Sequence, residues 1–211
     1  MTLESSKTLG GVGAILLLIG PLIGVLSYIQ PFQIEIALVG LIPLFSFILV
    51  PLFGFILVLI ALHDLASYYK ESGIFDNALY GFIAAIVGLV VAVIATVYVA
   101  FYTSILMVST VTPSAFWAMF SVLAILWIFL VISAFFNRRS LKMLLTKTSV
   151  AWFSDASLLL IIGAILTIVL IGLVILWIAV LLVAVAFFQI RPQPEQPAAP
   201  SAPQPQTPRP V

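Results

Sequence analysis

Residues 156–190 read ASLLLIIGAILTIVLIGLVILWIAVLLVAVAFFQI, a run without one charged residue that is bounded by Asp155 and Arg191. A helix needs only about 20 residues to cross the ~30 Å hydrocarbon core of a bilayer. This run is therefore too long for one comfortable crossing. It either crosses once, with strong tilt, or folds back as a hairpin, and this choice decides on which side of the membrane the chain ends.

The composition of the whole chain indicates an integral α-helical membrane protein. Apolar residues make up 64% of the 211 residues and charged residues only 7%, whereas a soluble domain is roughly half apolar and a quarter charged. The apolar residues form long blocks, as in membrane-spanning helices, without the alternation of a membrane β-barrel. A net charge of +1 gives no field that would attract nucleic acid, and without cysteine there is no disulfide or thiolate metal site.

The sequence predicts an all-α, polytopic fold with six membrane segments arranged as hairpins, or five segments if residues 156–190 cross once. The first apolar run, up to Ile29, is too long for a signal-peptide core, so we expect it to be retained as a span. Residues 191–211 form a proline-rich tail that cannot bury enough apolar surface to fold, and we expect it to be disordered. Residues 1–190 form the helical membrane domain, with segments expected at about 8–28, 36–62, 78–106, 115–136, 156–170 and 174–189.

The polar segments predict how the spans connect. His63 to Asn77 is expected to form a polar connection, with Asp76 as the N-cap of the third span. Asn137 to Arg139 is expected to end the fourth span, and residues 140–154 are expected to form a short amphipathic helix on the membrane surface. Pro21 is expected to kink the first helix or end it early.

The basic residues favour the hairpin over a single crossing at residues 156–190. Lys and Arg near span ends favour the cytoplasmic side. With a cytoplasmic N-terminus, the hairpin places all eight basic residues on that side, whereas a single crossing leaves Arg191 and Arg209 outside. A single helix would also leave Ile178 to Phe188 in water. We therefore expect a multi-pass protein of the cell membrane with both termini cytoplasmic.

The hairpin has a cost, because each arm would be only ~23 Å long, which is short for the bilayer. The bend is expected near Ile171-Gly172-Leu173, where Gly172 is the only residue suited to a sharp turn. The string Gly13-Ala14-Ile15-Leu16 recurs as Gly163-Ala164-Ile165-Leu166. This is either a chance match or the trace of two similarly oriented hairpins, as in transporters built from repeats.

Small residues recur along one face of the third span, at Gly81, Ala84, Ala85, Gly88, Ala92 and Ala95. Such a face lets a neighbouring helix approach closely.

Three strings in the chain are distinctive: Leu3-Glu4-Ser5-Ser6-Lys7-Thr8-Leu9-Gly10-Gly11, Phe75-Asp76-Asn77-Ala78-Leu79-Tyr80-Gly81 and Ala184-Val185-Ala186-Phe187-Phe188. Together they resemble an archaeal family of small multi-pass membrane proteins, the domain of unknown function 996. The resemblance covers about residues 3–190 and stops at the tail. It implies a membrane location, and it brings no known activity or functional residues.

No group of residues predicts catalysis, and we expect no catalytic, cofactor or metal site. His63 and Asp64 could relay protons or bind a metal. Adjacent helical residues point about 100° apart, however, and the chain has no second histidine, so an interfacial polar cap is favoured. Glu35 is expected to be a solvated turn residue. Helix breaks at Pro43, Pro51 and Gly54 could expose carbonyl groups to a substrate, although kinks that improve packing are favoured.

Two hypotheses for function follow. The first is a non-enzymatic scaffold or organiser that acts through helix–helix contacts, with a second copy or another membrane protein as partner. The alternative is a small transporter or channel for an uncharged or lipid-like solute, which the possible repeat and the broken helices suggest. No charged residue falls in mid-span, which argues against a proton- or ion-coupled transporter. Arg138, Arg139, Lys142 and Lys147 are expected to fix the orientation and could bind acidic lipid headgroups. Prolines 197, 200 and 203 share one edge of a polyproline helix, where a spacer is favoured over a partner site.

Overall fold

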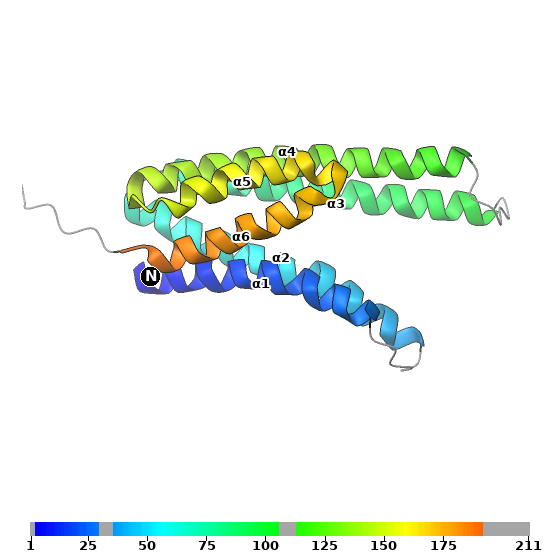
Figure 1. Ribbon diagram of the computed structural model, residues 1–211, viewed down its shortest axis with the longest axis horizontal. Helices are drawn as coiled ribbons and strands as arrows, with labels where there is room; N and C mark the ends of the chain where they lie inside the picture. The colour runs from blue at the N-terminus through cyan, green and yellow to red at the C-terminus, as the bar shows by residue number, and fades with distance from the viewer. Residues whose placement is uncertain (1–2, 30–35, 106–112, 192–211) are drawn as a thin grey trace, which may run out of the picture.

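The computed structural model describes residues 3–29, 36–105 and 113–191 of the chain (Figure 1). Within these ranges it has no strand, and six α-helices are each long and apolar enough to cross a membrane. The predictions of an all-α fold and of six membrane segments are confirmed. The elements are α1 (Leu3–Ile29), α2 (Ile36–Tyr69), α3 (Ser72–Ile105), α4 (Pro113–Thr148), α5 (Trp152–Leu166), the 3-10 helix η1 (Thr167–Val169) and α6 (Ile171–Gln189). Glu35 and the predicted tail, apart from Arg191, lie outside the described residues.

The helices form three antiparallel hairpins, α1–α2, α3–α4 and α5–α6. Contacts of α2 with α3, α4 with α5 and α1 with α6 join them. The N-terminal end of α1, the α2–α3 and α4–α5 connections and the last turn of α6 all lie at one end of the molecule, here called the basic end (Figure 1). From there the α1–α2 and α3–α4 hairpins diverge, and the α5–α6 hairpin reaches only about halfway along α4 (Figure 1).

The buried core lies toward the basic end, where all three hairpins meet. Phe153 of α5 and Phe187 of α6 are fully buried and pack edge to face, with ring centroids 5.7 Å apart. Ile74 is equally buried, and its carbonyl oxygen accepts a 2.6 Å hydrogen bond from the Ser140 hydroxyl of α4. Because burial is concentrated here, this end holds the hairpins together.

Glycines let the helices of two hairpins approach backbone to backbone. A Cβ atom on Gly13 of α1 would lie 2.6 Å from the carbonyl oxygen of Gly54, and one on Gly54 would lie 2.7 Å from that of Gly13. On α3, Gly81 packs against Asn137 and Gly88 against Phe129, both of α4. The small-residue face predicted for the third span is therefore occupied by the next helix of the same chain.

The α5–α6 hairpin confirms that residues 156–190 fold back near the predicted bend, but the prediction that Gly172 forms the turn is wrong. The chain reverses at Leu170, which has a left-handed φ of 63° after the 3-10 helix. Gly172 lies in the first turn of α6, where a Cβ atom would collide with backbone atoms of Thr167, Gly163 and Leu166. It is glycine because two backbones meet there, and the turn itself does not require it.

The predicted connections were wrong because polar residues do not stop these helices. α2 continues through His63 to Tyr69 and α3 begins at Ser72, so only Lys70 and Glu71 connect them. Asp76 lies inside α3 and is not its N-cap. α4 runs unbroken to Thr148, so there is no separate surface helix at residues 140–154. The helix continues because Leu141 and Leu144 of this segment are buried in the core.

α1 passes through Pro21 and continues to Ile29, and α2 is continuous through Pro51 and Gly54. These positions therefore do not end their helices. The repeated string occupies equivalent places in two hairpins, because Gly13 packs against α2 and Gly163 packs against Leu176 of α6. In both hairpins the first helix runs away from the basic end and the second runs back toward it (Figure 1).

Candidate functional site

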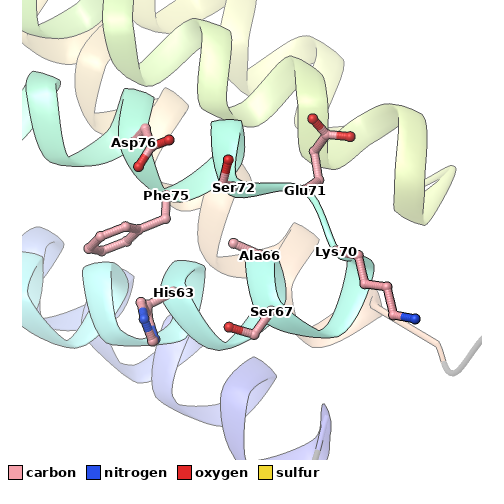
Figure 2. Close-up of a pocket in the computed structure, with 8 residues that line it drawn as sticks. All are labelled: His63, Ala66, Ser67, Lys70, Glu71, Ser72, Phe75 and Asp76. Atoms are coloured by element: carbon pink, nitrogen blue, oxygen red, sulfur yellow. The ribbon is translucent and has the colours of Figure 1, made fainter.

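A polar hollow of about 350 Å³ lies at the α2–α3 connection. Figure 2 shows His63 of α2 and Phe75 of α3 facing each other across it, with Asp76 on the next position of α3. The hollow is therefore lined by the only histidine of the chain and by Asp76 of the next helix. Its lining residues are His63, Ala66, Ser67, Lys70, Glu71, Ser72, Phe75 and Asp76.

The predicted pair of His63 and Asp64 is loosely arranged. The Nδ1 atom of His63 lies 3.7 Å from the nearer carboxylate oxygen of Asp64, which is beyond hydrogen-bond distance. The imidazole instead packs edge to face on Phe75, with ring centroids 5.0 Å apart, and its side chain is 61% exposed. Asp64 accepts a 3.3 Å hydrogen bond from the Ser6 hydroxyl. Asp64 therefore links α2 to α1, and it does not orient the imidazole.

Glu71 ties the α2–α3 connection to α4. Its carboxylate lies 3.1 Å from the Lys147 ammonium group, and both side chains are partly exposed. In Figure 2 the Glu71 side chain points toward α4, whereas Lys70 points away from the hollow. Such a partly exposed pair adds only a little stability, but it fixes which way the connection faces.

The chemistry available in this hollow is limited. Within the described ranges, no three His, Asp or Glu side chains gather closely enough to hold a metal ion. His63 and Asp76 alone are too few ligands for a structural or catalytic metal site. The geometry is that of a polar cap where two membrane helices enter water.

Two of the four predicted lipid-headgroup residues contact protein groups. The Arg139 guanidinium lies over the Phe135 ring, 4.7 Å from its centroid, and Lys147 pairs with Glu71. The Nε–H group of Arg138 is buried and donates no hydrogen bond within the described residues. Lys142 is exposed. The four therefore lie on the basic end of α4 in different environments, not in one shared pocket.

A second polar hollow, of about 750 Å³, lies at the basic end between α1, the α4–α5 connection and α6. Sequence reasoning missed it because its two cations, Lys7 and Arg191, come from opposite ends of the membrane domain. No local pattern connects them. It is lined by Lys7, Thr148, Ser149, Val150, Ala151, Trp152, Phe188, Gln189, Ile190 and Arg191.

Away from the basic end the hollows are apolar. One of about 550 Å³ is lined by Leu16 of α1 and five residues of α2, and another of about 460 Å³ lies between α3 and α4. A polar contact at mid-length comes from Trp127 of α4, whose indole group bonds to the end of α5. The described middle part of the molecule therefore presents surfaces suited to lipid tails and apolar side chains.

Comparison with known proteins agrees with the resemblance seen in the sequence. A family described as "Protein of unknown function (DUF996)" matches residues 50–181. The "Uncharacterized protein MJ1644" of Methanocaldococcus jannaschii is 24% identical over 190 residues, which cover 90% of this chain and 94% of that protein. No solved structure matches the chain.

Proposed function

The chain belongs to the DUF996 family of membrane proteins, and we propose that it is a non-enzymatic scaffold that acts through helix–helix contacts with a second copy of itself. The observation that carries this proposal is the bare outer half of the α3–α4 hairpin. The α5–α6 hairpin covers α4 only on the half nearest the basic end (Figure 1). Beyond it, two helices project without cover from the rest of the described chain.

The surface of this outer half is apolar and rich in aromatic side chains. Tyr98 of α3 is 68% exposed and Trp117 of α4 is 64% exposed. An apolar hollow between the two helices, lined by Ile94, Ala95, Ser121 and others, offers a groove for side chains of another helix. The glycine faces of α1 and α3 are already filled within the chain, so this groove is the surface that supports self-association. Aromatic residues are enriched in the centres of protein interfaces.

Cysteine cross-linking in native membranes tests this proposal cleanly because the chain has no cysteine of its own. We expect Val97→Cys, on the outer half of α3, to form a disulfide-linked dimer under mild oxidation. Val12→Cys, an exposed position on α1, is the matched control and should stay monomeric. Equal cross-linking at the two positions, or a monomer by mass photometry in lipid nanodiscs, would contradict self-association through α3–α4.

The orientation follows from the charges. We propose that the basic end faces the cytoplasm, because every described Lys and Arg lies in the parts of the chain nearest that end. Both ends of the membrane domain are then cytoplasmic. Arg138, Arg139, Lys142 and Lys147 would meet anionic headgroups there, each contributing about 1 kcal/mol.

A second function, movement of a lipid-like solute, is supported by the apolar hollow between α1 and α2. It is lined by Leu16, Leu49, Val50, Leu52, Phe53 and Ile56 and measures about 550 Å³. Lipid scrambling measures this directly. In vesicles that contain the protein, a fluorescent phospholipid should move from the inner to the outer leaflet, where an added quencher reaches it, faster than in empty vesicles. Leu49→Trp should lower this exchange rate. An exchange rate equal to that of empty vesicles would rule out this function.

A further inference from the structure

The hollow that contains Lys7 and Arg191 is built by helix packing. α1 and α6 run antiparallel, and Gly10 and Gly11 of α1 contact Phe187 and Phe188 of α6. One turn before Gly10, α1 reaches Lys7. Three residues beyond Phe188, the chain reaches Arg191. Both cations therefore lie at the same level of the basic end, where the hollow opens.

The α4–α5 connection closes another side of this hollow. Ser149 has a left-handed φ of 56°, and its amide donates a 2.8 Å hydrogen bond to the Leu145 carbonyl, which ends α4. The Ser149 side chain is exposed at this turn. Trp152, also exposed, begins α5, and no side chain caps that helix start. Hydroxyl groups and two cations thus border the same space.

The charge of the hollow is positive. Lys7 pairs with Glu4 at 2.8 Å, but the Glu4 side chain is largely exposed and is not part of the lining. An ammonium group has three hydrogen-bond donors, so this pair leaves donors for an anion. Among the residues that the structure describes, no acidic residue lines the hollow.

The lining of the hollow combines polar residues with aromatic ones. Trp152 and Phe188 are exposed aromatic residues in its lining, and tryptophan is typical of the headgroup level of a membrane. A ligand there would meet both cations and aromatic rings. That combination fits a phosphate group at the membrane surface.

We propose that this hollow binds the phosphate group of an anionic phospholipid or of a soluble phosphate ester, held by Lys7 and Arg191 with Ser149 as a further donor. The proposal needs only the described fold at the basic end, and it is independent of the scaffold function. The residues differ from the four basic residues of α4 discussed above.

Native mass spectrometry of the full chain in a neutral detergent tests the site. The protein is titrated with dioleoylphosphatidylglycerol, with dioleoylphosphatidylcholine and with glycerol 3-phosphate. The variants are Arg191→Gln, which leaves the Lys7–Glu4 pair intact, and the double variant K7Q/R191Q. The matched control Lys70→Gln removes one exposed cation from the same end without touching the hollow.

We expect phosphatidylglycerol to bind more tightly than phosphatidylcholine. Each cation near an anionic surface contributes about fivefold in affinity. Arg191→Gln should therefore weaken the first bound phosphatidylglycerol about fivefold and K7Q/R191Q about 30-fold, while Lys70→Gln changes it little. If the protein binds phosphatidylglycerol but not glycerol 3-phosphate, the site is a lipid site. If it also binds glycerol 3-phosphate, and K7Q/R191Q weakens that binding as much as it weakens phosphatidylglycerol binding, the site accepts soluble phosphate esters. A loss in Lys70→Gln equal to that in Arg191→Gln, or no loss in K7Q/R191Q, would overturn the proposal.

Discussion

Trp127 of α4 donates a hydrogen bond from its indole Nε1 to the carbonyl oxygen of Ala164, at 3.1 Å, and reaches that of Ile165 at 3.2 Å. These carbonyls belong to the last turn of α5, where no further helical amide is available to bond them. Thr167 adds a 2.7 Å hydrogen bond from its hydroxyl to the Gly163 carbonyl. A helix end inside a bilayer must satisfy such groups internally. Another helix and a threonine together do so here.

Replacement of Trp127 by phenylalanine should destabilise the hairpin. The ring is largely kept, but the carbonyls of Ala164 and Ile165 lose their donor. Hydrogen bonds between membrane helices contribute about 1 kcal/mol, so we expect a loss of this size in the free energy of unfolding, measured by steric trapping in bicelles. Trp117→Phe is the control, because Trp117 is exposed at the far end of α4, and it should change stability little. Equal stability of Trp127→Phe and the unmodified protein would show that the bond contributes nothing.

Alanine at Gly13 or at Gly54 should separate α1 from α2. The added methyl group would meet the partner's backbone, which cannot move aside as a side chain can. Overpacking of this kind costs about 1–3 kcal/mol, which we expect as a lower midpoint in thermal unfolding followed by size-exclusion chromatography.

Gly73→Ala is the matched control for these two changes. A methyl group there would meet only the end of the flexible Met143 side chain. It should lower the unfolding midpoint much less than Gly13→Ala. If all three variants behaved alike, close contact of the α1 and α2 backbones would not be what fixes this hairpin.

The bend of the α5–α6 hairpin should stay inside the hydrocarbon. From Trp117 to Asn137 α4 measures about 30 Å, which equals the thickness of the bilayer core, and Trp127 lies midway. The bend at Leu170 follows the Trp127 contact by little more than one turn, and Leu170 is 71% exposed. Leu170→Cys should therefore resist a membrane-impermeant maleimide from both sides of sealed vesicles and react after detergent is added. Labelling from the side opposite to Ser149→Cys would show that the hairpin crosses fully.

Cysteines at Ser149 and Arg191 should react from the same side of sealed vesicles. Ser149 lies in the α4–α5 connection and Arg191 follows α6, and both belong to the basic end. Maleimide labelling of Ser149→Cys and Arg191→Cys, separately, from the inside and the outside measures this. Labelling from opposite sides would mean that residues 156–190 cross once and that five segments span the membrane.

The membrane class and the fold-back of residues 156–190 could be predicted because both follow from length and charge along the chain. The ends of the helices could not be predicted. The sequence predicts that the chain leaves the lipid at Asn137 to Arg139, but α4 continues because Leu144 is buried against other hairpins. Sequence patterns show where a helix leaves lipid, and tertiary packing decides where it ends.

The candidate sites show the same limit. His63 and Asp64 were candidates because they are adjacent in the sequence. Adjacent side chains on a helix point in different directions, however, so His63 packs against Phe75 and Asp64 accepts a hydrogen bond from Ser6. Lys7 and Arg191 carry no motif, and only the packing of α1 on α6 brings them to one hollow. The prediction that the small-residue face of α3 contacts another helix is confirmed, but spacing alone could not identify α4 as its partner.

The unequal reach of the three hairpins gives the molecule a different cross-section in each leaflet. The described helices number six at the level of the basic end, but only the four of α1–α2 and α3–α4 extend past the Leu170 bend. The protein therefore displaces more lipid from one monolayer than from the other. Such a wedge is accommodated best where the bilayer curves with the crowded monolayer on its convex side, so we expect the protein to concentrate in membrane of that curvature.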